Sequence, residues 1–80
     1  VYIVRCSDST LYTGITTDVH RRINEHNNSS RAAKYTRSRR PVVLVYSCLA
    51  GNRSEALKEE YRIKKLSKSQ KNKLISAANN

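Results

Sequence analysis

Two pairs of side chains with acid–base or charge-binding chemistry lie near the start of the chain. Arg22 and His26 are four residues apart, so on a helix they project together and place a permanent cation beside a titratable ring. Tyr2 and Tyr12 lie in two β-prone segments that a short polar turn would join as a hairpin. A turn centred on residues 7 to 8 makes the two tyrosines cross-strand neighbours whose phenols face one pocket. The alternative is that both tyrosines only pack on a sheet.

Glu60 is the acidic residue that fits its helix least well. At helical spacing it shares a face with Ala56 and Ile63, where an apolar residue is expected. A carboxylate brought toward a core should be paired, protonated or bound to a cation. The structural alternatives are an ion pair with Lys64 or a place at the rim of the apolar stripe, and Glu25 is the other acid that competes for the role. A single protein carboxylate suits one Mg²⁺ ion that keeps several waters and binds a substrate phosphate.

The charge of the chain predicts a polyanionic partner. Its 80 residues include sixteen Lys and Arg and six Asp and Glu, a formal net charge of +10. Nucleic acid is the first choice because a positive field attracts phosphate backbones. An acidic membrane surface, an acidic protein, or a charge that only keeps a small domain soluble are the alternatives. Besides the last helix, six basic residues are expected to contact nucleic acid: Arg21, Arg31, Lys34, Arg37, Arg39 and Arg40.

Three apolar, β-prone runs predict the strands that would carry the tyrosines. They cover residues 1–6, 11–15 and 42–48, and the last is apolar enough to predict a well-covered strand rather than an exposed edge. With the helices below, the order is β-β-α-α-β-α-α. This order predicts an α+β fold with a small, mainly antiparallel three-stranded sheet flanked by helices, as one domain over residues 1–80.

Capping signals predict where the four helices begin. The first begins near Asp18, whose carboxylate can cap it, and a short second helix covers residues 31–37 after a polar break with serines. Asn52 opens a third helix as the first member of a capping-box-like pair. Ser67 opens the last helix in the same way. The third helix carries Glu60, and the first carries the arginine and histidine described above.

The two cysteines and the hydropathy pattern bound the environment. Cys6 and Cys48 lie in apolar runs without metal-site spacing, so they are expected to be small buried residues, with a disulfide left open. No run approaches the roughly 18 apolar residues of a membrane span, and no signal peptide opens the chain. We therefore expect a soluble, cytoplasmic monomer with no membrane partner, and recruitment by a partner protein stays open.

Together, these residues resemble the GIY-YIG nuclease superfamily, in particular its small stand-alone single-domain branch. Val1-Tyr2 resembles the end of the first signature, whose leading glycine would precede it or be absent, and Tyr12-Thr13-Gly14 resembles the second. Arg22, in a D-x-x-x-R setting, falls at the family's catalytic arginine, and His26 falls at a histidine of many members. Glu60 corresponds to the metal-binding glutamate. The positions follow in the right order over nearly the whole chain, which makes the match specific.

The resemblance implies a divalent-metal-dependent endonuclease that hydrolyses phosphodiester bonds in DNA, or alternatively RNA, with a repair or processing role. Selection would depend on structure rather than sequence. A single Mg²⁺ or Mn²⁺ ion would be bound by Glu60, and Arg22 would stabilise charge on the pentavalent phosphate. Tyr2 or Tyr12 would relay a proton from the attacking water, helped by Arg22, the metal or His26. Which tyrosine acts as the base stays open.

Two other functions remain as alternatives. One is a non-catalytic nucleic-acid-binding module with a degenerate nuclease fold, which turns over poorly or needs a partner protein. The other is a protein-interaction adaptor. Salt-sensitive binding to nucleic acid is expected of the nuclease and of the module, whereas only the nuclease cuts.

Overall fold

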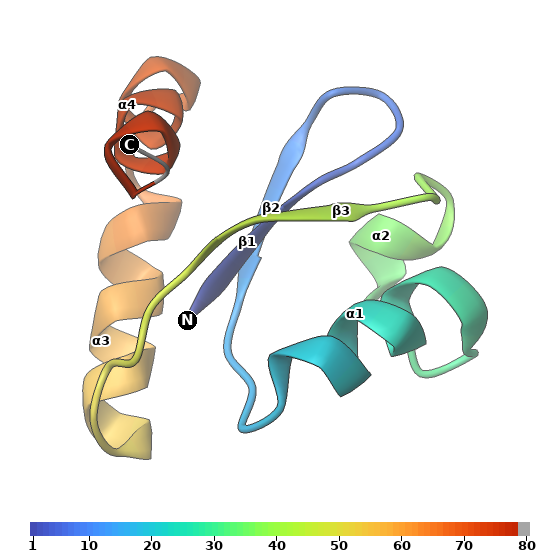
Figure 1. Ribbon diagram of the computed structural model, residues 1–80, viewed down its shortest axis with the longest axis horizontal. Helices are drawn as coiled ribbons and strands as arrows, with labels where there is room; N and C mark the ends of the chain where they lie inside the picture. The colour runs from blue at the N-terminus through green and yellow to red at the C-terminus, as the bar shows by residue number, and fades with distance from the viewer. Residues whose placement is uncertain (79–80) are drawn as a thin grey trace.

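A three-stranded antiparallel sheet separates two pairs of helices in the computed structural model, which describes residues 1–78 (Figure 1). The strands follow the order β2-β1-β3 across the sheet: β1 (Tyr2–Arg5), β2 (Leu11–Gly14) and β3 (Val43–Ser47). One face of the sheet is covered by α1 (Val19–Asn28) and α2 (Lys34–Arg37), and the other by α3 (Arg53–Lys64) and α4 (Lys68–Ala78) (Figure 1). The predicted α+β architecture and element order are confirmed. The domain predicted over 1–80 includes Asn79 and Asn80, which lie outside the described residues.

The central strand β1 supplies side chains to two cores. Ile3 is fully buried against Ile63 and Ile75 on the side of α3 and α4. Tyr2 and Val4 point to the opposite side and pack beneath α1. Since side chains alternate along a strand, four residues of β1 anchor both layers of helices.

The β1–β2 hairpin has a different register from the one predicted. Tyr2 pairs with Gly14 and Tyr12 pairs with Val4, so the two tyrosines, predicted as approximate cross-strand neighbours, are not directly opposite each other. The turn is centred one residue later than expected, because Ser9 adopts a left-handed φ of 69° and the hairpin closes around the loop 7–9. A shift of two residues keeps both tyrosine side chains on one face of the sheet, where they are diagonal neighbours.

Strand β3 is an edge strand, which corrects the expectation of a well-covered strand. Val43 is 60% exposed, and Ser47 at the other end is also exposed. A register shift opposite Ile3 and Val4 makes the pairing with β1 irregular. The apolar run of β3 is typical of a central strand because its inner residues pack against both layers of helices. However, β1 is the strand that pairs with a neighbour on each side.

Three of the four helices begin at the predicted caps. The Asp18 carboxylate accepts a hydrogen bond at 3.1 Å from the backbone N–H three residues later, and the Asn52 side chain does the same at 2.9 Å. Ser67 and Gln70 form a reciprocal capping box with bonds of 2.9 and 3.1 Å. These bonds satisfy backbone donors that the first turn of a helix leaves free.

Helix α2 is shorter than predicted. It begins at Lys34 rather than at residue 31, and its N-cap is Ala33, whose side chain cannot accept a hydrogen bond. Of the two serines expected to offer a cap, Ser29 instead ends α1, where its backbone N–H donates to the Glu25 carbonyl at 3.0 Å. Residues 30 to 33 therefore form a connection rather than a first helical turn.

Both cysteines are free thiols, so the disulfide alternative is not realised. Cys6 is buried as predicted and its burial raises the pKa of the thiol, whereas Cys48 is partly exposed. In the part of the chain that the structure describes, no helix has the length and apolar character needed to cross a membrane.

Candidate active site

A chain of hydrogen bonds links Tyr2 on β1 to both α1 and α2. The Tyr2 Oη atom lies 2.7 Å from His26 Nε2, and His26 Nδ1 lies 2.8 Å from Thr36 Oγ1. The Thr36 hydroxyl donates in turn to the Ala33 carbonyl at 3.0 Å. All three side chains are buried. Because Thr36 uses its proton on Ala33, His26 carries its hydrogen on Nδ1, and Nε2 accepts the proton of Tyr2.

The ring of His26 is neutral at physiological pH. Burial, followed by the nearby charge of Arg22, lowers the pKa of His26 to about 4. Burial also raises the pKa of the Tyr2 phenol, although the Arg22 guanidinium beside it opposes the rise. The expected arrangement was a permanent cation beside a titratable ring, and burial keeps that ring uncharged at neutral pH. What remains is a protonated phenol facing a neutral ring nitrogen that can accept its proton.

Tyr12 belongs to an aromatic stack on the same side of the sheet. Its ring meets the ring of His26 edge-on, with 5.6 Å between centroids, and stacks on Tyr35 at 5.8 Å. The guanidinium of Arg39 lies 4.0 Å from the centroid of the Tyr35 ring. Both phenol-bearing rings thus converge on His26, but Tyr12 is partly exposed whereas Tyr2 is buried.

Arg22 is held beside the Tyr2 phenol by contacts on its own side of the molecule. Its Nη1 atom lies 3.2 Å from Glu25 Oε1 and donates to the Arg31 carbonyl at 2.8 Å. Its charge acts on the pKa of Tyr2, which places the guanidinium close to that phenol. Glu25, the acid that competed for the role of Glu60, is occupied by this ion pair.

Glu60 lies on α3, in the opposite layer of helices, and after burial and the charges of nearer groups it acts weakly on the same phenol. Its negative charge contributes to the raised pKa of Tyr2. The side chain is 18% exposed, and Oε2 lies 3.4 Å from Lys64 Nζ. The ion pair weighed as an alternative is therefore present, and the carboxylate is nevertheless close enough to act on a group of the other layer.

Gly14 leaves the space in which the phenol of Tyr2 lies. A Cβ atom at this position would stand 2.6 Å from Tyr2 Oη and 2.8 Å from Cζ. The ring cannot move aside without losing its bond to His26. Close approach of an aromatic ring to bare backbone therefore requires glycine here.

The donor groups fit a hard divalent cation with few protein ligands. Among residues 1–78, no cluster of three or more His, Cys, Asp or Glu side chains could hold a metal ion. Glu60 offers carboxylate oxygens that remain partly open to solvent. Mg²⁺ is commonly bound through one or two carboxylates, with waters and substrate phosphate completing its shell. The residues present therefore fit a single ion on Glu60 that is shared with a substrate.

The basic residues predicted to contact nucleic acid fall into two groups. The side chains of one group bond within the chain: Arg37 to the Ser30 carbonyl, Arg39 to Asp8, and Arg40 to the carbonyls of His26 and Ser29. The side chains of the other group are exposed, and none has a partner among the described residues: Arg21, Arg31 and Lys34. Arg40 binds carbonyls at the C-terminal end of α1, where the helix dipole favours a cation.

Sequence reasoning missed Thr36 and Tyr35, both on α2. Thr36 fixes the tautomer of His26, and Tyr35 supports the ring of Tyr12. Nothing in the sequence singled out Thr36, because a hydroxyl in a short basic segment is ordinary. The signal for Tyr35 was available in its type, since an aromatic ring usually finds a packing partner.

Comparison with known proteins identifies the class to which this fold and site belong. The family model of the GIY-YIG catalytic domain matches residues 1–74. A UPF0213 protein of Desulfotalea psychrophila is 60% identical over 78 residues, covering 98% of this chain and 71% of that protein. A UPF0213 protein of Staphylococcus haemolyticus is 55% identical over 75 residues, covering 94% of this chain and 90% of its own.

A solved structure agrees with these sequence matches. The solution NMR structure of a UPF0213 protein from Bacillus halodurans has a TM-score of 0.60 and 46% identity, and it covers 95% of this chain and 80% of its own. The chain therefore belongs to the GIY-YIG family and, within it, groups with the UPF0213 proteins. The predicted resemblance is confirmed, and the family implies a nuclease-type function.

Proposed function

We propose that this chain is a divalent-metal-dependent endonuclease that hydrolyses phosphodiester bonds in DNA. The observation that carries the proposal is the bond between Tyr2 and His26, with the charges of Arg22 and Glu60 acting on the same phenol. A proton acceptor beside a hydroxyl, a permanent cation and a carboxylate are the groups that phosphodiester hydrolysis requires. The family match supports the reaction class.

Tyr2 is the proton relay in this proposal. Its oxygen accepts a proton from the attacking water while its own proton passes to Nε2 of His26. The water oxygen forms a bond to phosphorus as the bond from phosphorus to the leaving oxygen breaks. Thr36 keeps His26 in the tautomer that can take the proton. Tyr12, partly exposed and stacked beside the ring, orients the water or the phosphate.

Arg22 and Glu60 have electrostatic roles in this proposal. The guanidinium of Arg22 is always protonated and forked, so it suits the negative charge that develops on the phosphate oxygens. Its bonds to Glu25 and to the Arg31 carbonyl orient it before substrate arrives. Glu60 would hold one Mg²⁺ or Mn²⁺ ion, which would supply a positive charge to polarise the scissile phosphate.

The substrate class follows from the charge of the chain. A net charge of +10 supports binding to phosphate backbones, as do three exposed side chains that are unpaired within residues 1–78: Arg21, Arg31 and Lys34. Contacts of this kind carry little sequence information, so we infer selection of nucleic-acid structure rather than sequence. We propose DNA as the substrate, with RNA as the alternative, and a repair or processing role in the cytoplasm for a monomer.

The test compares wild type with Glu60→Gln on single-stranded, nicked and branched DNA and on RNA of matching sequence. Each substrate is incubated with Mg²⁺, with Mn²⁺ or with a chelator. We expect metal-dependent cutting by wild type and a loss of at least about 100-fold in Glu60→Gln, with binding retained. Glu55→Gln, which removes an exposed carboxylate from the same helix, is the matched control. Wild type that binds but leaves every substrate intact contradicts the proposal.

A non-catalytic nucleic-acid-binding module is the second candidate. Two observations favour it: Tyr2 is only 1% exposed, and Glu60 is paired with Lys64. Both fit a satisfied polar core as well as a reactive site. In that case Tyr2→Phe lowers the free energy of unfolding, and the protein binds nucleic acid with steep salt dependence but does not cut it.

A further inference from the structure

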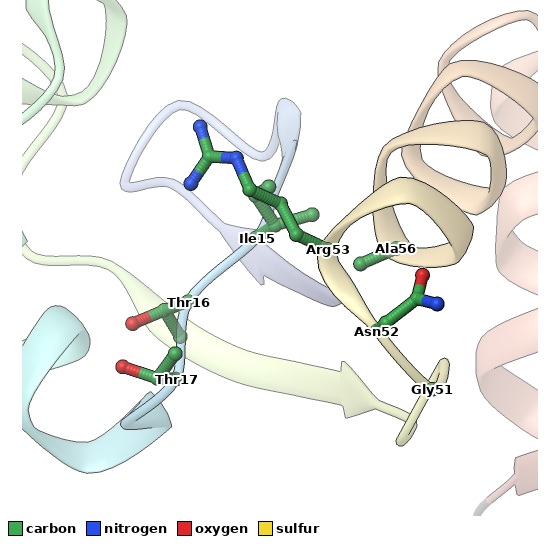
Figure 2. A pocket seen from close by; sticks show the side chains of 7 residues that line it. All are labelled: Ile15, Thr16, Thr17, Gly51, Asn52, Arg53 and Ala56. Atoms are coloured by element: carbon green, nitrogen blue, oxygen red, sulfur yellow. The ribbon is translucent and has the colours of Figure 1, made fainter.

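A groove separate from the phenol site lies between the β2–α1 connection and the start of α3. It has a volume of about 370 Å³, and Figure 2 shows the residues that line it: Ile15, Thr16, Thr17, Gly51, Asn52, Arg53 and Ala56. A second hollow of about 320 Å³ shares Thr16, Thr17, Gly51 and Ala56 with it and extends along the β3–α3 connection. The two hollows therefore form one continuous surface.

The groove combines an unpaired cation with an apolar floor. Arg53 is exposed and makes no ion pair or hydrogen bond through its side chain within residues 1–78. Figure 2 shows its side chain extended alongside Ile15. The exposed hydroxyl of Thr17 is also unbonded within that range, and Ile15 and Ala56 supply the apolar surface. A guanidinium and a hydroxyl suit a phosphate, and the apolar surface suits the sugar or base attached to it.

The position of the groove relates it to the phenol site. Ala56 precedes Glu60 by four residues, so the two lie on one helix face about 6 Å apart along the axis. On the other wall, Ile15 directly follows Gly14, the residue beneath the Tyr2 phenol. Successive nucleotides of one strand are about 3.4 Å apart along a duplex axis. A strand with one phosphate at Glu60 would thus place a nucleotide one or two steps away in the groove.

We propose that this groove binds a nucleotide that flanks the scissile phosphate on the same strand. Arg53 contacts its phosphate, and its sugar or base lies over Ile15 and Ala56. The location of the scissile phosphate rests on the proposed function, whereas occupancy of the groove can be measured without any cutting. Contacts to a phosphate and to the apolar face of a sugar or base carry little sequence information, so this subsite is expected to add affinity rather than sequence preference.

The first measurement follows binding in the absence of chemistry. Amide signals of ¹⁵N-labelled Glu60→Gln protein are recorded while a short single-stranded DNA oligonucleotide is added. We expect shifts at residues that line the groove: Thr16, Thr17, Gly51 and Arg53. Arg53→Gln should weaken binding about tenfold, since a charge-assisted contact is lost. It should also reduce the slope of log K against log salt by about 0.7, the value for one phosphate of a single strand.

Two further variants separate the groove from general charge. Lys58→Gln removes one exposed, unpaired cation from the same helix and should leave both the affinity and the salt slope close to those of wild type. Ala56→Leu fills the apolar floor without changing charge and should weaken binding as Arg53→Gln does. In cutting assays, Arg53→Gln should raise KM with kcat retained.

The outcomes distinguish this proposal from the nuclease itself. Groove shifts and an Arg53→Gln effect in a protein that never cuts support the groove and reject the nuclease. Cutting with unmoved groove amides, and with Arg53→Gln indistinguishable from Lys58→Gln, overturns the groove alone. Absence of oligonucleotide binding even at low salt overturns both.

Discussion

The two faces of the sheet differ in what they bury. Toward α1 and α2, a phenol, an imidazole and a hydroxyl lie in one bonded chain, made by Tyr2, His26 and Thr36. Toward α3 and α4, the core consists of isoleucines from β1, α3 and α4, and the buried hydroxyl of Thr13 has no partner among the described residues. Among residues 1–78, the charge of Glu60 in the second layer acts weakly on the Tyr2 phenol, after burial and nearer groups.

This difference indicates a division of labour within a very small sheet. Alternation along β1 sends Tyr2 to the polar layer and Ile3 to the apolar layer. Packing in the apolar layer holds β1 in a fixed position. The Tyr2 phenol on that strand therefore stays 2.7 Å from the His26 ring nitrogen in the polar layer. Substitutions that change only one of the two layers test this difference.

The largest effect is expected from removal of the relay hydroxyl. Tyr2→Phe should lower the single-turnover cutting rate by about 10²- to 10⁴-fold, because the proton path to His26 is lost. Tyr12→Phe should cost only about tenfold, since no bond joins its hydroxyl to that ring. Circular dichroism melting of both variants checks that each is folded. If Tyr12→Phe is the more damaging change, then Tyr12 is the base and the roles proposed for the tyrosines are reversed.

A smaller effect is expected from pH, through His26. Its folded pKa of about 4 lies below its ordinary value of 6.5, so the unfolded chain binds the proton more tightly. Stability is therefore fully present above about pH 6.5 and is lost as the pH falls toward 4, by up to about 3 kcal/mol. Arg22, Glu25 and Arg40 act on the same ring, with the arginines favouring and the glutamate opposing the neutral form.

Urea unfolding between pH 7 and pH 4 measures this dependence. His26→Gln should flatten the curve in that range, whereas the matched variant of an exposed histidine, His20→Gln, should keep the shape of wild type. A wild-type curve without a fall below pH 6.5 would mean that His26 is not held neutral.

The smallest effects compare the same chemical change on the two faces. Thr36→Val removes a hydroxyl that accepts from His26 and donates to Ala33, so it should lower the free energy of unfolding by about 1–3 kcal/mol. Thr13→Val removes a buried hydroxyl without a partner, so it should raise the free energy of unfolding by about 1 kcal/mol. Thermal melting at pH 7 measures both. Equal losses in the two variants would remove the contrast between the layers.

Local signals in the sequence predicted where helices and strands lie better than they predicted which of these elements pack or pair together. Asp18, Asn52 and Ser67 mark helix starts because a cap acts within three residues. The predicted register of the hairpin differs from the observed one by two residues, because the left-handed conformation of Ser9 moves the centre of the turn. Serine rarely adopts that conformation, so its presence did not predict it. The edge position of β3 depends on pairing across the whole chain, which no local pattern reports.

The candidate site shows the same limit. Glu60 was predicted from its place on an apolar helix face, Arg22 from its spacing to His26, and Tyr2 from the hairpin, and the family signature relates the three residues. Thr36 was missed because its importance lies in a contact made ten residues from His26, not in its own segment. The direction in which the pKa of His26 is shifted was not predicted, since burial is a property of the folded chain.

The contacts of Arg39 affect the local unfolding of the β1–β2 hairpin. Its side chain bonds to Asp8 at 3.0 Å and its carbonyl accepts from the backbone N–H of Ser7 at 2.9 Å, so the tip of the hairpin is fastened to the segment after α2. Surface turns usually exchange their amide hydrogens quickly, but this one should exchange in step with α2 as a single cooperative unit. Residues inserted at the tip of the hairpin should therefore disturb the packing of the tyrosine rings. Inserted residues should be better tolerated near the fully exposed Leu49.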